Sequence, residues 1–267
     1  MNFSFMSFSC PELGFDGMLD VARQYGYDGV EPRISAKHKH GIEFDASEAY
    51  RESCRQKAEA KGIRICCVAT SCCYADPAKA DSMVTDTHRA IDLAGDVGAP
   101  LIRVFGGQIG KGLTRQKAVK LVADSLRAVA DHAEERGVAV ALETHDDWCD
   151  PTQVAEIMRR VNRPNVGVNW DIMHPARVAK ASMDAAFQAL QPWLRHVHFH
   201  DGATTSSGGI ELKPIGEGEI DHRRAVVLLK KAQYDGFLSG EWISWQPYAQ
   251  HLPRELAMMK LYEQEVG

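Results

Sequence analysis

The sequence lacks a long apolar run, and it carries no excess of basic residues. No hydrophobic stretch reaches the roughly 20 residues that a membrane-spanning helix needs, so we expect no membrane segment. Lys and Arg together number 31 and Asp and Glu number 36, which gives a formal charge of -5. A mildly acidic chain has no general attraction for nucleic acid or for an anionic membrane. We therefore predict neither as a partner.

The sequence also lacks the features of a secreted, disulfide-stabilised protein. Residues 1–15 have neither the basic start nor the cleavage site of a signal peptide. Seven cysteines are present, and four of them fall in CCVATSCC, residues 66–73. Neighbouring strand residues point to opposite faces, so these four thiols are not expected to share one zinc ion. We predict reduced, buried thiols and a cytoplasmic location.

No low-complexity segment or Pro/Gly-rich linker divides the 267 residues. Instead, one unit recurs: a short β-rich run that ends in polar residues, followed by a stretch with helical spacing of its apolar residues. The helical stretches 15–26, 47–62 and 113–137 each end on glycine, as helices often do. The β-rich runs are residues 2–9, 28–33, 63–70, 100–106, 138–145, 166–171, 196–201 and 236–242.

Eight strand-then-helix units predict an α/β fold, a (β/α)₈ TIM barrel that forms a single domain over residues 1–267. A doubly wound open sheet is the alternative. Such sheets usually carry a glycine-rich turn after the first strand, and SFSCPELGF, residues 7–15, is not one. In a barrel the active site lies at the carboxyl ends of the strands, so the residues there are the candidates for chemistry.

Ligand-type side chains stand at the ends of four consecutive expected strands. They are Glu143, Asp171, His198 and Glu241. Each has an ordinary explanation alone, as an ion-pair partner, a helix cap or a buried histidine. Together they favour a site for one divalent metal ion. Three carboxylates and one imidazole suit Mn²⁺ best, then Mg²⁺ or Co²⁺, with Zn²⁺ also compatible.

The seventh expected strand, HVHFHD at 196–201, carries three histidines in alternation. On a strand they would share one face. Three imidazoles side by side are costly unless each finds a partner. One buried histidine and two exposed ones would be the ordinary explanation. We interpret this face instead as one that looks into a site, where at least one imidazole binds a metal.

The order of these motifs resembles one known family. LExH at 142–145, DxxH at 171–174, HVHxxD at 196–201, GEGxID at 216–221 and GE at 240–241 are similar to motifs of the sugar phosphate isomerase/epimerase family. This family is also called the xylose isomerase-like TIM-barrel family. Its members include ketose 3-epimerases, hydroxypyruvate isomerase, enzymes that act on inososes, dehydroshikimate dehydratase and endonuclease IV. The resemblance covers essentially the whole chain.

The resemblance implies a role for each matching residue. The metal ligands would be Glu143, Asp171, His198 and Glu241. The two glutamates would also carry protons to and from the substrate, and His145 and His174 would line the substrate site. His198 is then the ligand among the three alternating histidines. His196 is expected one pleat deeper in the barrel, and His200 at its rim.

Other polar and aromatic residues near the expected strand ends are weaker candidates for substrate contacts. They are Glu31, Arg33, Trp148, Lys213 and Glu217. Charged loop residues are more often solvated, and a rim tryptophan is often ordinary packing. Glu31 could contact substrate, or it could pair with Arg33 or Arg103.

The predicted activity is that of a metal-dependent isomerase or epimerase of a small sugar or keto-polyol. A metal ion polarises the substrate carbonyl and stabilises the enediolate oxygen, while a carboxylate takes the proton from the neighbouring carbon. A second carboxylate on the opposite face could return the proton with inversion. Loss of a β-hydroxyl would instead give a dehydratase, a lyase acting on an inosose, keto sugar or dehydroshikimate-like compound. This alternative stays open.

Two other functional classes are disfavoured. An endonuclease IV-like phosphodiesterase needs further histidines, and residues 101–108 contain none, while residues 202–216 lack an Asp-x-His pair. A non-catalytic sugar-binding module would not need both glutamates. The missing glycine-rich anion turn after the seventh strand favours an unphosphorylated substrate. Barrels of this kind often pair, so a homo-oligomer is compatible with the sequence.

Overall fold

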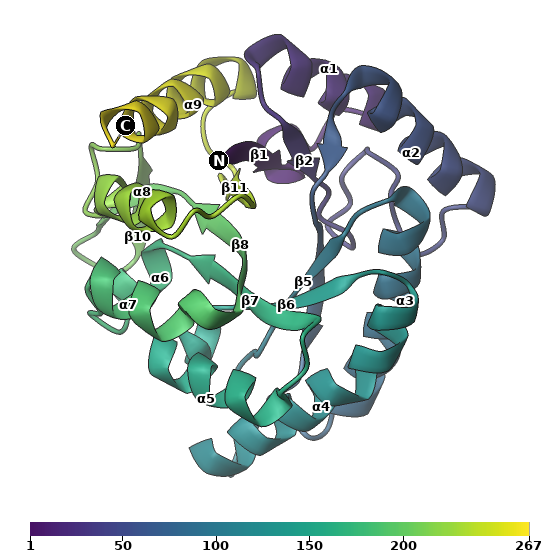
Figure 1. Cartoon of the computed structure of the whole chain (residues 1–267), viewed down its shortest axis with the longest axis vertical. Helices are drawn as coiled ribbons and strands as arrows, with labels where there is room; N and C mark the ends of the chain where they lie inside the picture. Colours follow the sequence, from purple (N-terminus) through teal and green to yellow (C-terminus); the bar gives the residue numbers. More distant parts are fainter. Residues whose placement is uncertain (267) are drawn as a thin grey trace.

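The computed structural model describes residues 1–266. They form one barrel, in which a parallel sheet of nine strands is surrounded by helices (Figure 1). The sheet order is β3-β2-β1-β11-β8-β7-β6-β5-β4. The predicted TIM barrel is thereby confirmed, and the open doubly wound sheet is excluded. The strands are β1 (Asn2–Met6), β2 (Gly29–Glu31), β3 (Arg64–Ile65), β4 (Val68–Cys73), β5 (Leu101–Phe105), β6 (Ala139–Glu143), β7 (Val166–Asp171), β8 (Leu194–Phe199) and β11 (Phe237–Gly240).

The two edges of this sheet, β3 and β4, are halves of the third expected strand. The chain leaves the regular ladder at Cys66 and Cys67, so β3 pairs with β2 while β4 pairs with β5. The backbone N–H of Cys66 still donates to Val30 O at 3.0 Å, and Arg33 forms a bridge with Ala69. The interruption lets one stretch of chain change its pairing partner, which closes the barrel.

Helices form a ring outside the strands, and the last helix lies beside the first (Figure 1). Their ends follow the predicted signals. Gly26 and Gly62 take left-handed φ values of 82° and 67°, and the side chain of Asp150 accepts from the backbone N–H of Thr152 at 2.9 Å. The α-helices are α1 (Phe15–Tyr25), α2 (Glu48–Lys61), α3 (Ala80–Val97), α4 (Arg115–Glu135), α5 (Pro151–Val161), α6 (Met173–Arg177), α7 (Met183–Leu190), α8 (His222–Lys231) and α9 (Tyr248–Glu265). Short 3₁₀ turns are η1 (Ser7–Ser9), η2 (Asp146–Trp148) and η3 (Gln191–Trp193).

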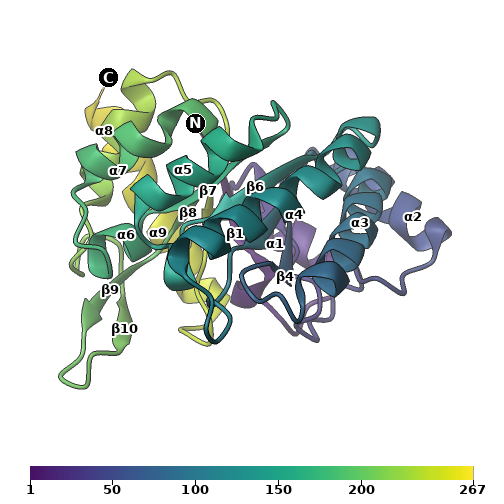
Figure 2. The ribbon, with the colours of Figure 1, turned by 90° about the horizontal axis from the view of Figure 1, so that it is seen from below.

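A two-stranded antiparallel hairpin interrupts the alternation after β8. Its strands, β9 (Asp201–Thr204) and β10 (Ile210–Lys213), project from the body of the barrel (Figure 2). The sequence analysis predicts no strands here. The carboxylate of Asp201 anchors the hairpin, because it accepts from the backbone N–H groups of Gly202, Gly216 and Gly218 at 2.8, 2.9 and 3.1 Å. The buried Asp201 therefore holds the hairpin and its return loop over the carboxyl end of the barrel.

The strand alternation separates a polar interior from an apolar outer core. On β8, Val197 and Phe199 point toward the helices, whereas His196 and His198 point into the barrel. Within residues 1–266, no helix is both long enough and apolar enough to cross a bilayer.

Candidate metal and substrate site

Four buried ligand-type side chains converge where β6, β7, β8 and β11 end. They are Glu143, Asp171, His198 and Glu241, and one ligand atom of each lies within 4.8 Å of the others. The imidazole of His198 is central, with Nδ1 3.4 Å from Oε2 of Glu143 and 3.3 Å from Oε2 of Glu241. Among the described residues, every other such group has only three members. The structure thus brings together the four residues that the sequence singled out.

Unpartnered atoms in this group fit a bound cation. Oε1 of Glu143 and Nδ1 of His198 are buried, and neither has a hydrogen-bond partner within residues 1–266. A buried polar atom without a partner typically costs about 1–3 kcal/mol. A metal ion would take both as ligands and remove this cost.

The charges around the group point the same way. Four buried carboxylates gather here, opposite two guanidinium groups and the imidazoles of His198 and His200. The carboxylates are Glu31, Glu143, Asp171 and Glu241, and the guanidinium groups are Arg33 and Arg103. Buried carboxylates need positive partners to be stable, so these surroundings suit a bound cation.

The carboxylate of Glu31 lies one layer below the mouth and binds two of the alternating histidines. Nε2 of His196 donates to Oε2 at 2.9 Å, and Nε2 of His198 donates to Oε1 at 3.0 Å. Burial alone would raise the pKa of Glu31, but these imidazoles hold it well below its usual value. The hydrogen-bond partners of Glu31 are thus these two imidazoles rather than the expected Arg33 or Arg103. By occupying Nε2 of His198, Glu31 leaves Nδ1 for the cluster above.

Arg103 and Asn169 hold one oxygen of Glu143. Nε of Arg103 lies 2.9 Å from Oε2, and Nδ2 of Asn169 donates to the same oxygen at 3.1 Å. Burial raises the pKa of Glu143, and the charges of Arg103 and His198 oppose this only in part. Burial also acts on Glu241, but the nearby His198 imidazole lowers its pKa to about 2. From the sequence, Arg103 was expected only as a possible partner of Glu31 and Asn169 was not expected here, although an arginine in the apolar run LIRVF was a usable signal.

The two carboxylate oxygens of Asp171 have different hydrogen-bond partners. Oδ1 accepts from the backbone N–H groups of Met173 and His174 at 2.9 and 3.1 Å, as a helix cap does. Oδ2 accepts from Nε2 of His200 at 2.9 Å. Burial lowers the pKa of His200, but the charge of Asp171 outweighs it, and the net shift is upward. His200 follows the end of β8 at Phe199, near the rim where it was expected, but only 6% of it is exposed.

A cavity of about 270 Å³ opens beside this group. His145, His174 and His200 form one wall, with ring centroids 4.4 Å and 5.8 Å apart between successive members. Burial would lower the pKa of His145, but Asp146, whose carboxylate lies 3.1 Å from Nδ1, raises it to about 9. The remaining lining residues are Met173, Ile210, Leu212, Glu241 and Ile243. Among the described residues that line it, the charged or chargeable side chains are these histidines and Glu241, with no lysine or arginine.

The weaker substrate candidates occupy different places. Arg33 lies near the cluster and donates to Oγ of Ser71 at 2.6 Å; burial and the neighbouring Arg103 lower its pKa to about 10. Lys213 does not line the cavity. Its hairpin neighbours Ile210 and Leu212 do, so Lys213 faces the other side, where it binds Glu211 at 2.8 Å.

Glu217 and Trp148 are also kept away from this cavity. Glu217 is exposed in the turn after β10. Trp148 is fully buried, and its Nε1 donates to Gly107 O at 2.8 Å. Its role is therefore the packing of the loop after β5, and neither residue lines the cavity.

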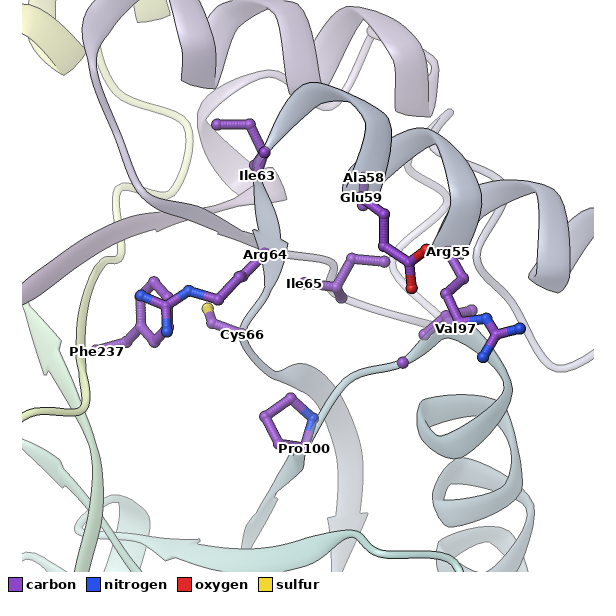
Figure 3. Close-up of a pocket in the computed structure, with 12 residues that line it drawn as sticks. Arg55, Ala58, Glu59, Ile63, Arg64, Ile65, Cys66, Val97, Pro100 and Phe237 are labelled. Carbon is purple, nitrogen blue, oxygen red and sulfur yellow. The ribbon is translucent and has the colours of Figure 1, made fainter.

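A larger cavity, about 460 Å³, lies at the opposite end of the barrel (Figure 3). Its walls are mostly apolar, and the guanidinium of Arg64 lies 4.3 Å from the ring centroid of Phe237. In TIM barrels the amino-terminal face generally serves stability rather than chemistry. Cys66 lines this cavity, and all seven cysteines are free thiols. Within residues 1–266, the four thiols of residues 66–73 form no common ligand group.

Comparisons with known proteins agree with this geometry. The family model described as xylose isomerase-like TIM barrel matches residues 19–262. The 3-dehydroshikimate dehydratase of Bacillus anthracis is 23% identical over 197 residues, which cover 73% of this chain and 69% of that protein. A solved structure of IOLI protein with a binding zinc atom has a TM-score of 0.82 at 19% identity, covering 100% of this chain and 98% of that one. A structure of D-psicose 3-epimerase has a TM-score of 0.80 at 14% identity, with 100% of each chain covered.

Proposed function

Because the chain belongs to the xylose isomerase-like TIM barrel family, we propose that it is a divalent-metal-dependent isomerase or epimerase of a small sugar or keto-polyol. Homologous and structurally similar proteins are enzymes, among them a dehydratase and an epimerase. The observation that carries the proposal is the buried group of Glu143, Asp171, His198 and Glu241. The free thiols support a cytoplasmic location.

The same four residues would hold the ion. Oxygen ligands with one imidazole favour Mn²⁺, and the zinc atom in the similar IOLI protein structure makes Zn²⁺ the second choice. When bound, the ion supplies a Lewis acid that draws electrons from the substrate carbonyl and acidifies the neighbouring C–H bond. Substrate oxygens could bind the ion beside these four residues, because one of them, Glu241, lines the cavity.

The proton transfers are assigned to Glu143 and Glu241. They come from the two outer strands of the four, β6 and β11, and each lies within 3.5 Å of the same nitrogen of His198. From these places they can approach the substrate from two sides. A proton removed on one side and returned on the other inverts the carbon. A proton returned to the neighbouring carbon interconverts an aldose and a ketose.

A dehydratase is the second candidate, favoured by the similarity to 3-dehydroshikimate dehydratase. The first step, removal of a proton next to the carbonyl, would be the same. The electron pair would then expel a β-hydroxyl, which must take up a proton to leave as water. His145 is placed in the cavity wall to donate that proton, and Asp146 keeps it protonated by raising its pKa to about 9.

The test is an assay of the Mn²⁺-loaded protein in D₂O against ketoses, inososes and keto acids, with EDTA-treated protein as the control. Solvent deuterium at a substrate carbon without loss of water identifies an isomerase or epimerase. Loss of water identifies the dehydratase. Turnover that persists after EDTA treatment would contradict the metal-dependent mechanism.

A further inference from the structure

A second cavity, about 450 Å³, borders the catalytic one. It lies between η1, the loop after β2 and the segment that leads from β11 into α9. Ile243 lines both cavities, and it follows Glu241 by two residues. The second cavity therefore begins beside a candidate proton carrier and continues the mouth of the barrel outward.

Aromatic side chains form much of its lining. Trp245 and Tyr248 come from one side of the cavity, and Phe8 and His38 come from the other. The ring centroids of Phe8 and His38 lie 5.0 Å apart. The guanidinium of Arg254 lies 5.1 Å from the Trp245 ring centroid, and Arg254 does not line the cavity. Trp245 is thus supported by a contact outside the cavity. Aromatic faces of this kind stack on other rings, whether aryl groups or the C–H faces of sugars.

Two lining residues carry polar atoms that lack partners. The hydroxyl of Ser9, a residue only 8% exposed, has no hydrogen-bond partner within residues 1–266, and neither does Oε1 of Gln246. An unsatisfied buried hydroxyl is costly. A ligand hydroxyl could satisfy either atom, because it can accept from Oγ of Ser9 and can donate to Oε1 of Gln246, whereas an ether oxygen could only accept from Ser9.

The charges of the lining select against an anionic ligand. Glu12 is its only acidic residue, and it has no lysine or arginine. Burial, together with the charge of Arg33, lowers the pKa of His38. A phosphate or nucleotide group would therefore meet no cation here.

The two cavities together have the size of an ordinary small-molecule site, whereas the inner one alone is smaller. The inner cavity, about 270 Å³, is smaller than the roughly 300–1,000 Å³ of ordinary small-molecule pockets. With the adjoining 450 Å³ the site falls within that range.

We propose that the outer cavity is a subsite for a second ring, and that the substrate is an uncharged glycoside. The reacting sugar ring occupies the inner cavity. The ring attached through its glycosidic oxygen packs against Trp245 and Tyr248, with Ser9 in reach of its oxygens. The position of the reacting ring rests on the function proposed above, whereas the subsite itself rests on the outer cavity.

Binding to the Mn²⁺-loaded full chain tests the subsite. The probes are methyl β-D-glucopyranoside with one ring, cellobiose with two sugar rings and phenyl β-D-glucopyranoside with an aryl ring, each titrated by calorimetry. We expect at least one two-ring probe to bind about tenfold more tightly than the methyl glycoside. Preference for cellobiose identifies a second sugar, and preference for the phenyl glycoside identifies an aromatic aglycone. Equal affinity for all three overturns the proposal.

Substitutions locate the effect. We call the ratio of the affinity for the better two-ring probe to that for the methyl glycoside the two-ring advantage. Trp245→Ala should lower this ratio from about ten to about one. Trp193→Ala is the matched control. Trp193 is also partly buried, and the guanidinium of Arg159 lies 5.7 Å from its ring centroid. It lies in η3, at the amino end of β8 and away from the outer cavity. The control variant should keep the advantage. If Trp245→Ala does not fold, Tyr248→Leu takes its place. An advantage that survives in these subsite variants contradicts the assignment.

The subsite and the proposed function fail separately. If Glu241→Gln abolishes turnover while the two-ring advantage persists, both proposals stand. If the advantage is absent but Mn²⁺-dependent turnover of single-ring sugars is found, only the subsite is wrong. If the advantage is present but no keto sugar exchanges solvent deuterium, the reaction is wrong and the subsite remains.

Discussion

The carboxylate of Glu31 and the imidazole of His198 are joined by a hydrogen bond of 3.0 Å in the buried interior of the barrel. Nε2 of the imidazole donates this bond. The opposite ring nitrogen, Nδ1, consequently faces Glu143 and Glu241 at the mouth. A carboxylate behind a histidine in this way fixes both the tautomer and the ring orientation that a metal ligand needs.

Glu31→Gln should weaken Mn²⁺ binding about 10–100-fold, the usual effect of losing a group that orients a metal ligand. The two oxygens of Glu31 accept from two imidazole N–H groups, whereas glutamine has only one acceptor oxygen. Its amide N–H₂ would face the second imidazole N–H, and the two donors would repel each other. Calorimetric titration with Mn²⁺ measures the change. Glu263→Gln, which alters a partly exposed partner of the chain's first amino group, is the control. Equal affinities of the two variants would contradict this role of Glu31.

The histidines at 198 and 200 should differ in their effect on the metal. His198→Ala removes a proposed ligand and should abolish tight Mn²⁺ binding. His200→Ala removes only the bond to Oδ2 of Asp171, so we expect a loss of about tenfold, at the lower end of effects on residues behind the ligands. Bound metal is measured by elemental analysis after dialysis. Complete loss in both variants would show that His200 is itself a ligand.

Glu143→Gln and Glu241→Gln should each lower kcat about 10²–10⁴-fold, the range for a lost general acid or base. Glutamine keeps one ligating oxygen but cannot carry the proton, so KM should change far less. Steady-state kinetics on whichever sugar turns over measures both. Glu211→Gln, on the outer face of the hairpin, is the control. Near-full activity of both glutamine variants would direct attention to His145 or His174 as the base.

Acid should destabilise the protein through His40. Burial lowers its pKa to about 4, and its Nδ1 accepts from the backbone N–H of Ile42 at 3.0 Å. The unfolded chain takes up this proton near pH 6.5 and the folded chain only near pH 4, so stability is present above pH 6.5 and is lost as the pH falls toward 4. The loss from this group is about 3 kcal/mol.

Urea unfolding of the EDTA-treated protein between pH 4 and 7.5 measures this effect. His40→Asn keeps an acceptor oxygen for Ile42 but cannot be protonated. The variant should therefore lose less free energy of unfolding than the wild type on acidification. Parallel pH profiles of the two proteins would show that His40 does not carry the effect.

The barrel and the four ligand-type residues could be predicted from the sequence because both depend on local patterns. Strand alternation, helix ends and the strand-end rule place Glu143, Asp171 and Glu241 without any knowledge of long-range contacts. The interruption at Cys66 and Cys67 could not be foreseen, because it is set by pairing with two different strands.

The contacts that support the site were missed for the same reason. Glu31 lies 165 residues from His196 and 167 from His198, and no local pattern reports such pairs. Lys213 was misplaced because its direction depends on the register of an unexpected hairpin. The bond between His200 and Asp171 was not foreseen either, because the two residues lie 29 positions apart.

Anomalous diffraction from crystals of the protein grown with Mn²⁺ tests the central claim most directly. We predict one strong peak per chain, bounded by Nδ1 of His198 and by carboxylate oxygens of Glu143, Asp171 and Glu241. Asp171→Asn should weaken the peak under the same conditions. A peak among Asp171, His174 and His200, or one beside Cys66, or no peak within the barrel, would contradict the proposed metal site.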